Sequence, residues 1–308
     1  MRVIITGGTG LIGSNLAQDL IEDGYELIVL SRNPENVKGL PAGVQVVGWD
    51  ARTAKGWGEL ADNAFAIVNL AGASLAGEGF FATPWTDERK KLIVQSRLDA
   101  GKAVLEAIEA AENKPKVLVQ SSAIGYYSAR GDEDLDEESR PGNDFLADVC
   151  KQWEAVTRPA EDMGVRRVVI RTGVVLTLEG GAFTRLLLPF KLFAGGPMGS
   201  GRQYLSWIHI TDEIRAIRFL MENEQAQGVF NLTAPAPKRS KTFARVLGGI
   251  MKRPGFIPVP AFALKLMFGE VATVVVDGQK VYPRNLQELG FEYKYAELEP
   301  ALRDLLGK

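Results

Sequence analysis

The stretch ITGGTGLIGSNLA, residues 5–17, constrains the fold of this chain more than any other feature. It follows the apolar run RVIIT and leads into a helical pattern, with a glycine at every third position. In such a loop the first glycine permits a sharp turn, the second lets the backbone approach a pyrophosphate, and the third allows helix and strand to pack closely. Amide groups at the start of the helix then face the phosphates. The stretch predicts a dinucleotide site whose contacts are Gly7, Thr9, Gly10, Leu11, Ile12 and Gly13.

The first half of the chain alternates short apolar runs with helical patterns. The runs cover residues 2–6, 26–30, 44–48, 66–72, 116–122 and 166–172, and the helical patterns cover 11–23, 86–112 and 144–163. Apolar strands that alternate with helices are typical of a parallel sheet covered on both faces. We therefore expect an α/β protein with a Rossmann-type, doubly wound parallel sheet, which a further strand at 228–234 rejoins.

The sequence pattern changes after the sixth run, where glycine and proline cluster and apolar runs become scarce. We expect a dinucleotide-binding Rossmann domain over residues 1–172, to which the chain returns at about 206–232. The remaining residues, 173–308, are expected to form a smaller C-terminal, substrate-side region.

Charge and composition argue against several classes of protein. The 36 basic residues nearly balance the 38 acidic ones, so no net field draws the chain to nucleic acid or to anionic membranes. The single cysteine, Cys150, and the single histidine, His209, allow neither an internal disulfide nor a Cys/His zinc cluster. No signal peptide precedes the first strand, so we expect a cytoplasmic protein. The apolar stretch 256–276 is interrupted by charges and prolines and predicts a buried or partner-facing helix rather than a membrane span.

The residues after the second and third runs indicate which dinucleotide the loop binds. An acidic residue after the second run would hold a ribose 2′-hydroxyl, but the chain has Ser31 and Arg32, whose donors and positive charge suit a 2′-phosphate. We therefore expect NADP(H). Asp50 ends the third run and is expected to reach the adenine. The end of the fourth run is expected to line the path of the ribose and nicotinamide with Leu70, Ala71 and Gly72.

Several motifs together resemble an atypical group of the extended short-chain dehydrogenase/reductase superfamily, the YfcH-like epimerase family. They include ITGGTGLIGSNLA, VNLAGASL, QSRLDAGKAVLEAI, SSAIGYY, FLADVCKQWE, VIRTGVVL and GGPMGSGRQYLSWIHITDE, and the tail resembles the uncharacterised C-terminal domain of that group. The resemblance covers nearly the whole chain. It implies an NADP(H)-binding reductase or epimerase that acts on a small polar substrate, such as a sugar- or nucleotide-linked compound. Division-inhibitor-like relatives imply an alternative, a non-catalytic NADP(H)-dependent regulator that binds a protein partner in cell or plastid division.

The catalytic pair of that superfamily is missing from the chain. Its reaction uses a tyrosine as acid or base, a lysine four residues later that brings the tyrosine pKa into range, and a serine that orders the substrate oxygen. Ser122 fits the serine position, but with Lys151 as the lysine the tyrosine position falls on Ala147. The nearest phenols belong to Tyr127 and to Tyr126, for which packing is the alternative role. Three explanations remain open: one of these phenols is the acid, the pocket senses redox state without turnover, or substrate groups or water carry the proton.

Other polar residues near these motifs have both a functional and a structural interpretation. Ser121, Lys151 and Arg171 are candidates for contact with the cofactor. Arg97 and Arg202 are candidates for contact with an anionic substrate. In the structural alternative, Arg97 forms an ion pair, Arg202 is a surface residue on a glycine-rich loop, and Lys151 is a solvated helix residue.

A few further residues favour structural roles. Cys150 is expected to be a small buried core residue, and His209 a hydrogen-bonded structural residue on a strand. Thr211 or Asp212 is expected to cap the helix that follows. The acidic run at 130–139 is expected to face water.

Overall fold

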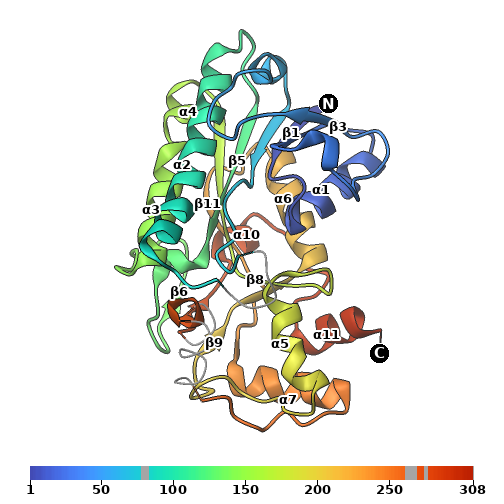
Figure 1. Ribbon diagram of the computed structural model, residues 1–308, viewed down its shortest axis with the longest axis vertical. Helices are drawn as coiled ribbons and strands as arrows, with labels where there is room; N and C mark the ends of the chain where they lie inside the picture. Colours follow the sequence, from blue (N-terminus) through green and yellow to red (C-terminus); the bar gives the residue numbers. More distant parts are fainter. Residues whose placement is uncertain (78–82, 261–268, 274–276, 308) are drawn as a thin grey trace.

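A seven-stranded parallel sheet forms the upper part of the molecule (Figure 1). The structure is a computed structural model, and it describes residues 1–77, 83–260, 269–273 and 277–307. Its strand order is β11-β7-β5-β4-β1-β2-β3, and every neighbouring pair runs parallel. The strands are β1 (Arg2–Thr6), β2 (Glu26–Ser31), β3 (Gln45–Gly48), β4 (Ala66–Asn69), β5 (Val117–Ala123), β7 (Arg166–Thr172) and β11 (Gly228–Leu232). The predicted Rossmann-type fold is confirmed, including the late strand that rejoins the sheet.

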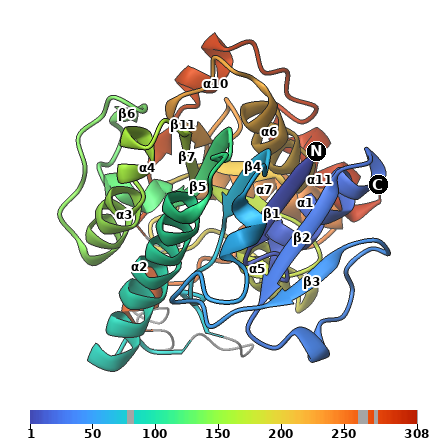
Figure 2. The ribbon, with the colours of Figure 1, turned by 90° about the horizontal axis from the view of Figure 1, so that it is seen from above.

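Helices cover both faces of this sheet, which explains why its strands are apolar at nearly every position (Figures 1 and 2). One face packs against α1 (Leu11–Glu22) and α6 (Ile210–Glu222), and the other against α2 (Asp87–Ala110), α3 (Phe145–Val156) and α4 (Pro159–Asp162). On β1, for example, Val3 and Ile5 belong to the α1/α6 core whereas Ile4 belongs to the core under α2. Alternate side chains therefore enter two separate cores.

Two predictions about helix ends were wrong. The helix expected over 144–163 is divided into α3 and α4, because Pro159 has no N–H for the helix ladder and instead occupies the first position of α4. The N-cap of α6 is His209, whose Nδ1 accepts a hydrogen bond from the backbone N–H of Thr211 at 3.1 Å. Asp212 is instead buried, and it accepts bonds from the backbone N–H groups of residues 294 and 295.

The chain also builds a second core in the lower part of Figure 1. There α5 (Gly181–Lys191), α7 (Ser240–Met251) and α11 (Leu298–Leu306) pack around side chains such as Phe183, Trp207 and Leu247. Short strands join this C-terminal region together: β8 (Val174–Leu176) pairs with β10 (Trp207–His209), and β9 (Tyr204–Leu205) pairs with β12 (Lys238–Arg239). We call these helices and strands the C-terminal region below.

The remaining elements are short. They are η1 (Pro34–Asn36), η2 (Gly58–Ala61), η3 (Ile124–Tyr127), β6 (Asp134–Leu135), η4 (Gly269–Ala272), β13 (Lys280–Val281) and α10 (Arg284–Glu288). Along the described parts of the chain, no helix combines the length and the apolar composition that crossing a bilayer requires. The helix expected within 256–276 lies largely outside the described residues.

The acidic run at 130–139 does not simply face water as expected. It contributes β6, which pairs with β13, and Leu135 is fully buried there. Glu137 turns inward, where its Oε1 accepts the backbone N–H of Asn231 at 2.8 Å, and burial raises the pKa of its carboxyl. Local charge density gave no sign of these contacts, because strand pairing with a distant segment draws the run against the sheet.

Glu213 is a buried acid on α6, and it should make the stability of the fold depend on pH. Its Oε1 accepts the Thr172 hydroxyl at 2.8 Å, and burial raises the pKa of Glu213 to about 8. Between the ordinary value of 4.5 and about 8 the native state holds a proton that the unfolded chain releases. The contribution of Glu213 to the free energy of unfolding should therefore fall by about 1.4 kcal/mol for each unit by which the pH rises within this window.

We predict that Glu213→Gln removes this slope, so that the variant gains stability relative to the parent as pH rises from 5 to 8. Urea unfolding across that range measures the difference, with Glu292→Gln, an exposed acid, as the control. A difference between Glu213→Gln and the parent that stays constant with pH would contradict the assignment.

Candidate functional site

The turn between β1 and α1 brings three backbone segments into direct contact. Gly7 has a φ of +68°, and a Cβ atom there would lie 2.9 Å from the carbonyl carbon and oxygen of Leu70 at the end of β4. A Cβ atom at Gly13 would lie 2.5 Å from the Gly7 carbonyl oxygen. Both distances are shorter than van der Waals contact. The first and third glycines of the motif are therefore required by geometry, as the sequence predicts.

The start of α1 has the features of an oxyanion site. Its N-cap, Gly10, is exposed and provides no side-chain cap, and the first turn carries no acidic residue. The first amides of a helix have no intrahelical acceptor and carry the positive end of the helix dipole. Thr9 is exposed beside them, and Leu11 and Ile12 are half-buried. A pyrophosphate fits this cradle because its oxygens would accept the free amide hydrogens.

Ser31, Arg32 and Asp50 lie together at the ends of β2 and β3, since residues 31 and 48 pair across these strands. The Ser31 hydroxyl oxygen accepts the backbone N–H of residue 33 at 3.2 Å, and Arg32 is exposed. Asp50 accepts the backbone N–H groups of Thr53 and Arg52, which lower the pKa of its carboxyl. The edge therefore presents a cation without an ion-pair partner among the described residues, Arg32, and an acid, Asp50, that orders its own loop.

A chain of buried side-chain hydrogen bonds crosses β1, β4 and β5, and the sequence did not lead us to predict it. Thr6 donates to Asn69 at 2.6 Å, Asn69 donates to Gln120 at 2.9 Å, and Gln120 donates to the carbonyl of Ser121 at 2.7 Å. The Thr6 hydroxyl also accepts the backbone N–H of Ala71 at 3.2 Å. The ends of β1, β4 and β5 are thus tied together. Polar residues inside otherwise apolar runs were the signal available in the sequence.

A second buried network lies at the ends of β5, β7 and β11. Arg171 donates to both carboxylate oxygens of Glu154, each at 2.8 Å, and from Nη1 to the Tyr127 hydroxyl at 2.9 Å. Ser122 donates its hydroxyl proton to Glu154 at 2.7 Å. Tyr127 in turn donates to Asn231 at 2.7 Å. Arg171 therefore pairs with a carboxylate that the sequence analysis did not single out.

The two candidate tyrosines have different environments. Tyr127 is fully buried, and burial raises its pKa to about 12, which makes it a poor proton donor near neutral pH. Tyr126 is half-buried, and its ring lies under the Arg171 guanidinium, with 3.4 Å from Cζ to the ring centroid. No hydrogen bond engages the Tyr126 hydroxyl among the described residues.

The face of α3 toward β5 carries Leu146, Cys150 and Glu154 rather than Lys151. Cys150 lies 3.5 Å from the carbonyl of residue 123, and burial raises the pKa of its thiol to about 11. A Cβ atom at Gly125 would lie 3.3 Å from the Leu146 Cβ. Lys151 pairs with an acid on its own helix and is partly exposed. The α3 side chains that contact the end of β5 are thus a thiol and a carboxylate, and Lys151 lies on a different face of the helix.

The two arginines proposed for the substrate lie apart. Arg97 is buried beneath the loop after β4, where its Nη1 donates to the carbonyls of Ala73 at 3.1 Å and Ile93 at 2.8 Å. No ion pair to Arg97 is found among the described residues, so the expected structural partner is not present there. Arg202 is exposed on the loop before β9, in the C-terminal region.

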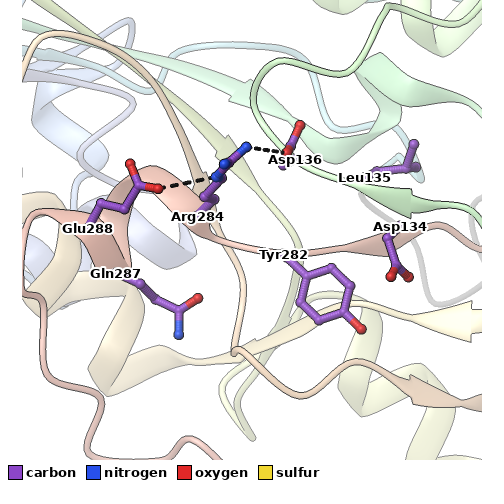
Figure 3. Close-up of a pocket in the computed structure, with 7 residues that line it drawn as sticks. All are labelled: Asp134, Leu135, Asp136, Tyr282, Arg284, Gln287 and Glu288. Carbon is purple, nitrogen blue, oxygen red and sulfur yellow. Dashed lines mark hydrogen bonds and ion pairs between the residues drawn. The ribbon is translucent and has the colours of Figure 1, made fainter.

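A separate surface pocket of about 460 Å³ opens between β6, β13 and α10 (Figure 3). Arg284 crosses it and pairs with Asp136 and Glu288, each at 3.1 Å. Its third acid, Asp134, pairs with Lys280, so the charged groups of the pocket are already paired, and we place no chemistry in it. Within the described ranges no group of three or more His, Cys, Asp or Glu is arranged to hold a metal ion.

A parallel sheet with this glycine turn at its carboxyl edge defines a dinucleotide-binding α/β protein. The chain belongs to the NAD dependent epimerase/dehydratase family, whose model matches residues 3–233. Residues 259–305 match a domain of unknown function, DUF1731.

Similar proteins agree with this assignment. An epimerase family protein SDR39U1 homolog, chloroplastic, from Arabidopsis thaliana is 40% identical over 99% of this chain and 87% of its own length. The crystal structure of human epimerase family protein SDR39U1 (isoform 2) with NADPH superimposes with a TM-score of 0.87 at 34% identity, covering 100% of this chain and 99% of that one. A nucleoside-diphosphate sugar epimerase from Corynebacterium glutamicum superimposes with a TM-score of 0.76 at 30% identity, over 100% of this chain and 58% of that one.

Removing one member of the Arg171–Glu154 pair should lower the free energy of unfolding strongly, whereas replacing both members together should lower it less. Arg171→Met leaves a largely buried carboxylate without its cation, and we expect a loss of about 3–5 kcal/mol in the free energy of unfolding. The double variant Arg171→Met/Glu154→Leu removes both charges and should lose less than the single one. Chemical denaturation measures both.

Arg303→Met is the matched control, because its pair with Glu299 is half-exposed and should contribute less than about 1 kcal/mol. The single variant Glu154→Leu is measured as well. If the double variant loses as much stability as Arg171→Met and Glu154→Leu lose together, the carboxylate and the guanidinium are not coupled as described.

Proposed function

We propose that this protein is an NADP(H)-dependent oxidoreductase or epimerase that acts on a small polar substrate. The observation that carries the proposal is the backbone cradle made by Gly7, Gly13 and the uncapped start of α1. Its geometry excludes side chains and leaves amide donors for a pyrophosphate. The human relative crystallised with NADPH supports the same cofactor for this chain.

The residues around the cradle fit the rest of the cofactor. Ser31 and Arg32 would hold the 2′-phosphate, and Asp50 lies where an adenine would pass. The path of the ribose and nicotinamide would run along Leu70, Ala71, Gly72 and Ser121, with Lys151 and Arg171 as further proposed contacts. When bound, NADP(H) supplies hydride transfer, in which an alcohol and NADP⁺ give a carbonyl, NADPH and a proton.

Ser122 is proposed to orient the reacting oxygen. Its hydroxyl proton is already donated to Glu154, which Arg171 holds in place through two bonds. Ser122 therefore presents oxygen lone pairs, and it would accept a hydrogen bond from a substrate hydroxyl. In this arrangement Glu154 acts as a positioning residue.

Tyr126 is the better placed of the two phenols for proton transfer. Tyr127 already donates its proton to Asn231 and accepts from Arg171, so it has no remaining donor. Tyr126 is partly exposed on the same turn, η3, directly after β5. We assign Tyr127 to the packing of the site and Tyr126 to the proton.

The substrate class is proposed from a relative. The neighbour from Corynebacterium glutamicum is a nucleoside-diphosphate sugar epimerase, and it covers this chain over its full length. A sugar- or nucleotide-linked alcohol supplies both the hydroxyl that Ser122 would accept and a carbon from which hydride can leave.

The cofactor preference should depend on Arg32. We predict that the parent binds NADPH at least ten-fold more tightly than NADH, and that Arg32→Ala removes about 10–100-fold of the affinity for NADPH while leaving NADH little changed. Fluorescence titration with both nucleotides measures this. Equal affinities in the parent protein would contradict the 2′-phosphate assignment.

The two tyrosines should respond differently to loss of the hydroxyl. Tyr126→Phe should lower the rate of hydride transfer by about 10²–10⁴-fold with the fold intact, whereas Tyr127→Phe should mainly destabilise the buried network. Single-turnover absorbance of bound NADPH against a metabolite pool measures the first effect, and thermal unfolding the second. A protein that binds NADPH tightly and never oxidises it would overturn the enzymatic proposal.

A further inference from the structure

Arg97 is a buried cation at the edge of the proposed crevice. Its residue is 7% exposed, and its guanidinium stacks on Trp153 of α3, with 4.5 Å from Cζ to the ring centroid. Gly72, near the start of the loop after β4, is exposed, and a Cβ atom there would lie 3.0 Å from the Arg97 Cζ. The exposed backbone of Gly72 therefore packs on the guanidinium, close to the carboxyl edge where ligands of such sheets bind.

The charge of Arg97 is not neutralised by the protein in the described parts of the chain. Nη1 is engaged by two carbonyl oxygens, but Nε is buried without a hydrogen-bond partner. Burial lowers the pKa of Arg97 to about 10, so the group still carries its charge at neutral pH. An unpaired buried charge is unfavourable, and a perturbed buried cation beside a ligand-binding edge is a candidate for a functional site.

A second arginine reinforces this positive site. Arg89 lies two helical turns before Arg97 on α2, donates to the carbonyl of Ser74 on the same loop, and has a buried Nε without a partner among the described residues. Its charge contributes to lowering the pKa of Arg97. Two cations on one helix face thus hold consecutive parts of the loop after β4.

The charge of the C-terminal part of the chain has the same sign. Residues 180–211 contain three Lys or Arg and no Asp or Glu, and residues 225–269 contain seven and none. Although the whole chain is slightly acidic, these segments are purely basic. Such an uneven distribution favours the approach of anionic ligands.

We propose that Arg97, supported by Arg89, binds an oxyanion of the substrate, a carboxylate or a phosphate, next to the β4 loop. This deepens the proposed function and rests on it: the substrate would be an acidic alcohol whose hydroxyl meets Ser122 and whose anionic group meets Arg97. The helix α3 links the two residues, since Cys150 contacts the carbonyl after Ser122 and Trp153, one turn later, stacks on Arg97. The two groups would therefore belong to one small molecule.

The test uses the full-length protein saturated with NADPH, so that the 2′-phosphate and pyrophosphate positions are already filled. Inorganic phosphate and malonate are titrated at constant ionic strength against chloride, and the unfolding midpoint is recorded. At concentrations ten-fold above the dissociation constant we expect the effective anion to raise the midpoint by about 2–4 °C. The anion with the larger effect identifies the phosphate or carboxylate class.

Arg97→Met should abolish this shift, and Arg97→Lys should reduce it, while Arg158→Met, an exposed arginine, should leave it unchanged. If Arg97→Met fails to fold, Gly72→Ala provides a second variant, because its methyl group would lie 3.0 Å from the Arg97 Cζ, should displace the guanidinium and should also remove the shift. Affinity for NADPH is measured in every variant.

The outcomes separate this inference from the proposed function. If the parent protein binds NADPH but neither anion stabilises it more than chloride does, the inference fails and the cofactor site stands. The same conclusion follows if Arg97→Met responds to anions like the parent. If the parent binds no NADPH, the proposed function itself fails.

Discussion

Backbone contact at the first turn is the constraint on which the rest of the site depends. Gly7, Gly13 and the end of β4 approach one another so closely that no side chain fits between them. Contacts of this kind have no rotamers to adjust, so β1, α1 and β4 keep fixed positions relative to one another. The hydrogen bonds from Thr6 through Asn69 to Gln120 extend that order to β5. The edge that would receive a dinucleotide is therefore preorganised by the protein alone.

The second network fixes the side chains around the end of β5. Arg171 and Glu154 neutralise each other in a largely buried position and set the orientation of Ser122 and Tyr127. A charge pair held in this way serves as a scaffold, because protonating Glu154 or deprotonating Arg171 would leave the other charge buried without a partner. In the proposed reaction, proton transfer is assigned to Tyr126, which lies at the margin of this network.

Much of the fold could be predicted because it depends on burial that is visible in short windows. Each strand of the main sheet is buried on both faces, so its apolar run marks it directly, and Gly7 and Gly13 are imposed by local turn geometry. Pro159 lies within the helical pattern 144–163, so the division of that helix could have been predicted from the sequence. The cap at His209 was not visible as such, since a histidine is an uncommon N-cap residue.

The site was harder to predict than the fold, because its roles depend on helix rotation and on partners distant in sequence. A shift of one residue on α3 places Cys150 and Glu154, rather than Lys151, toward β5. The role of Glu154 requires Arg171 on another strand, and the inward turn of Glu137 requires Asn231. No periodicity in the sequence records such pairings.

The path of the chain also bears on how the upper and lower parts of the molecule can move relative to each other. After β7 the chain leaves the sheet for β8, comes back as α6, leaves again after β11 and returns to pair β13 with β6 (Figure 1). Repeated crossings of this kind connect the upper and lower parts through several short links rather than one. These links resist rotation of the two parts about a single hinge. We therefore expect ligands to reach the proposed cofactor site through small sliding movements between packed elements.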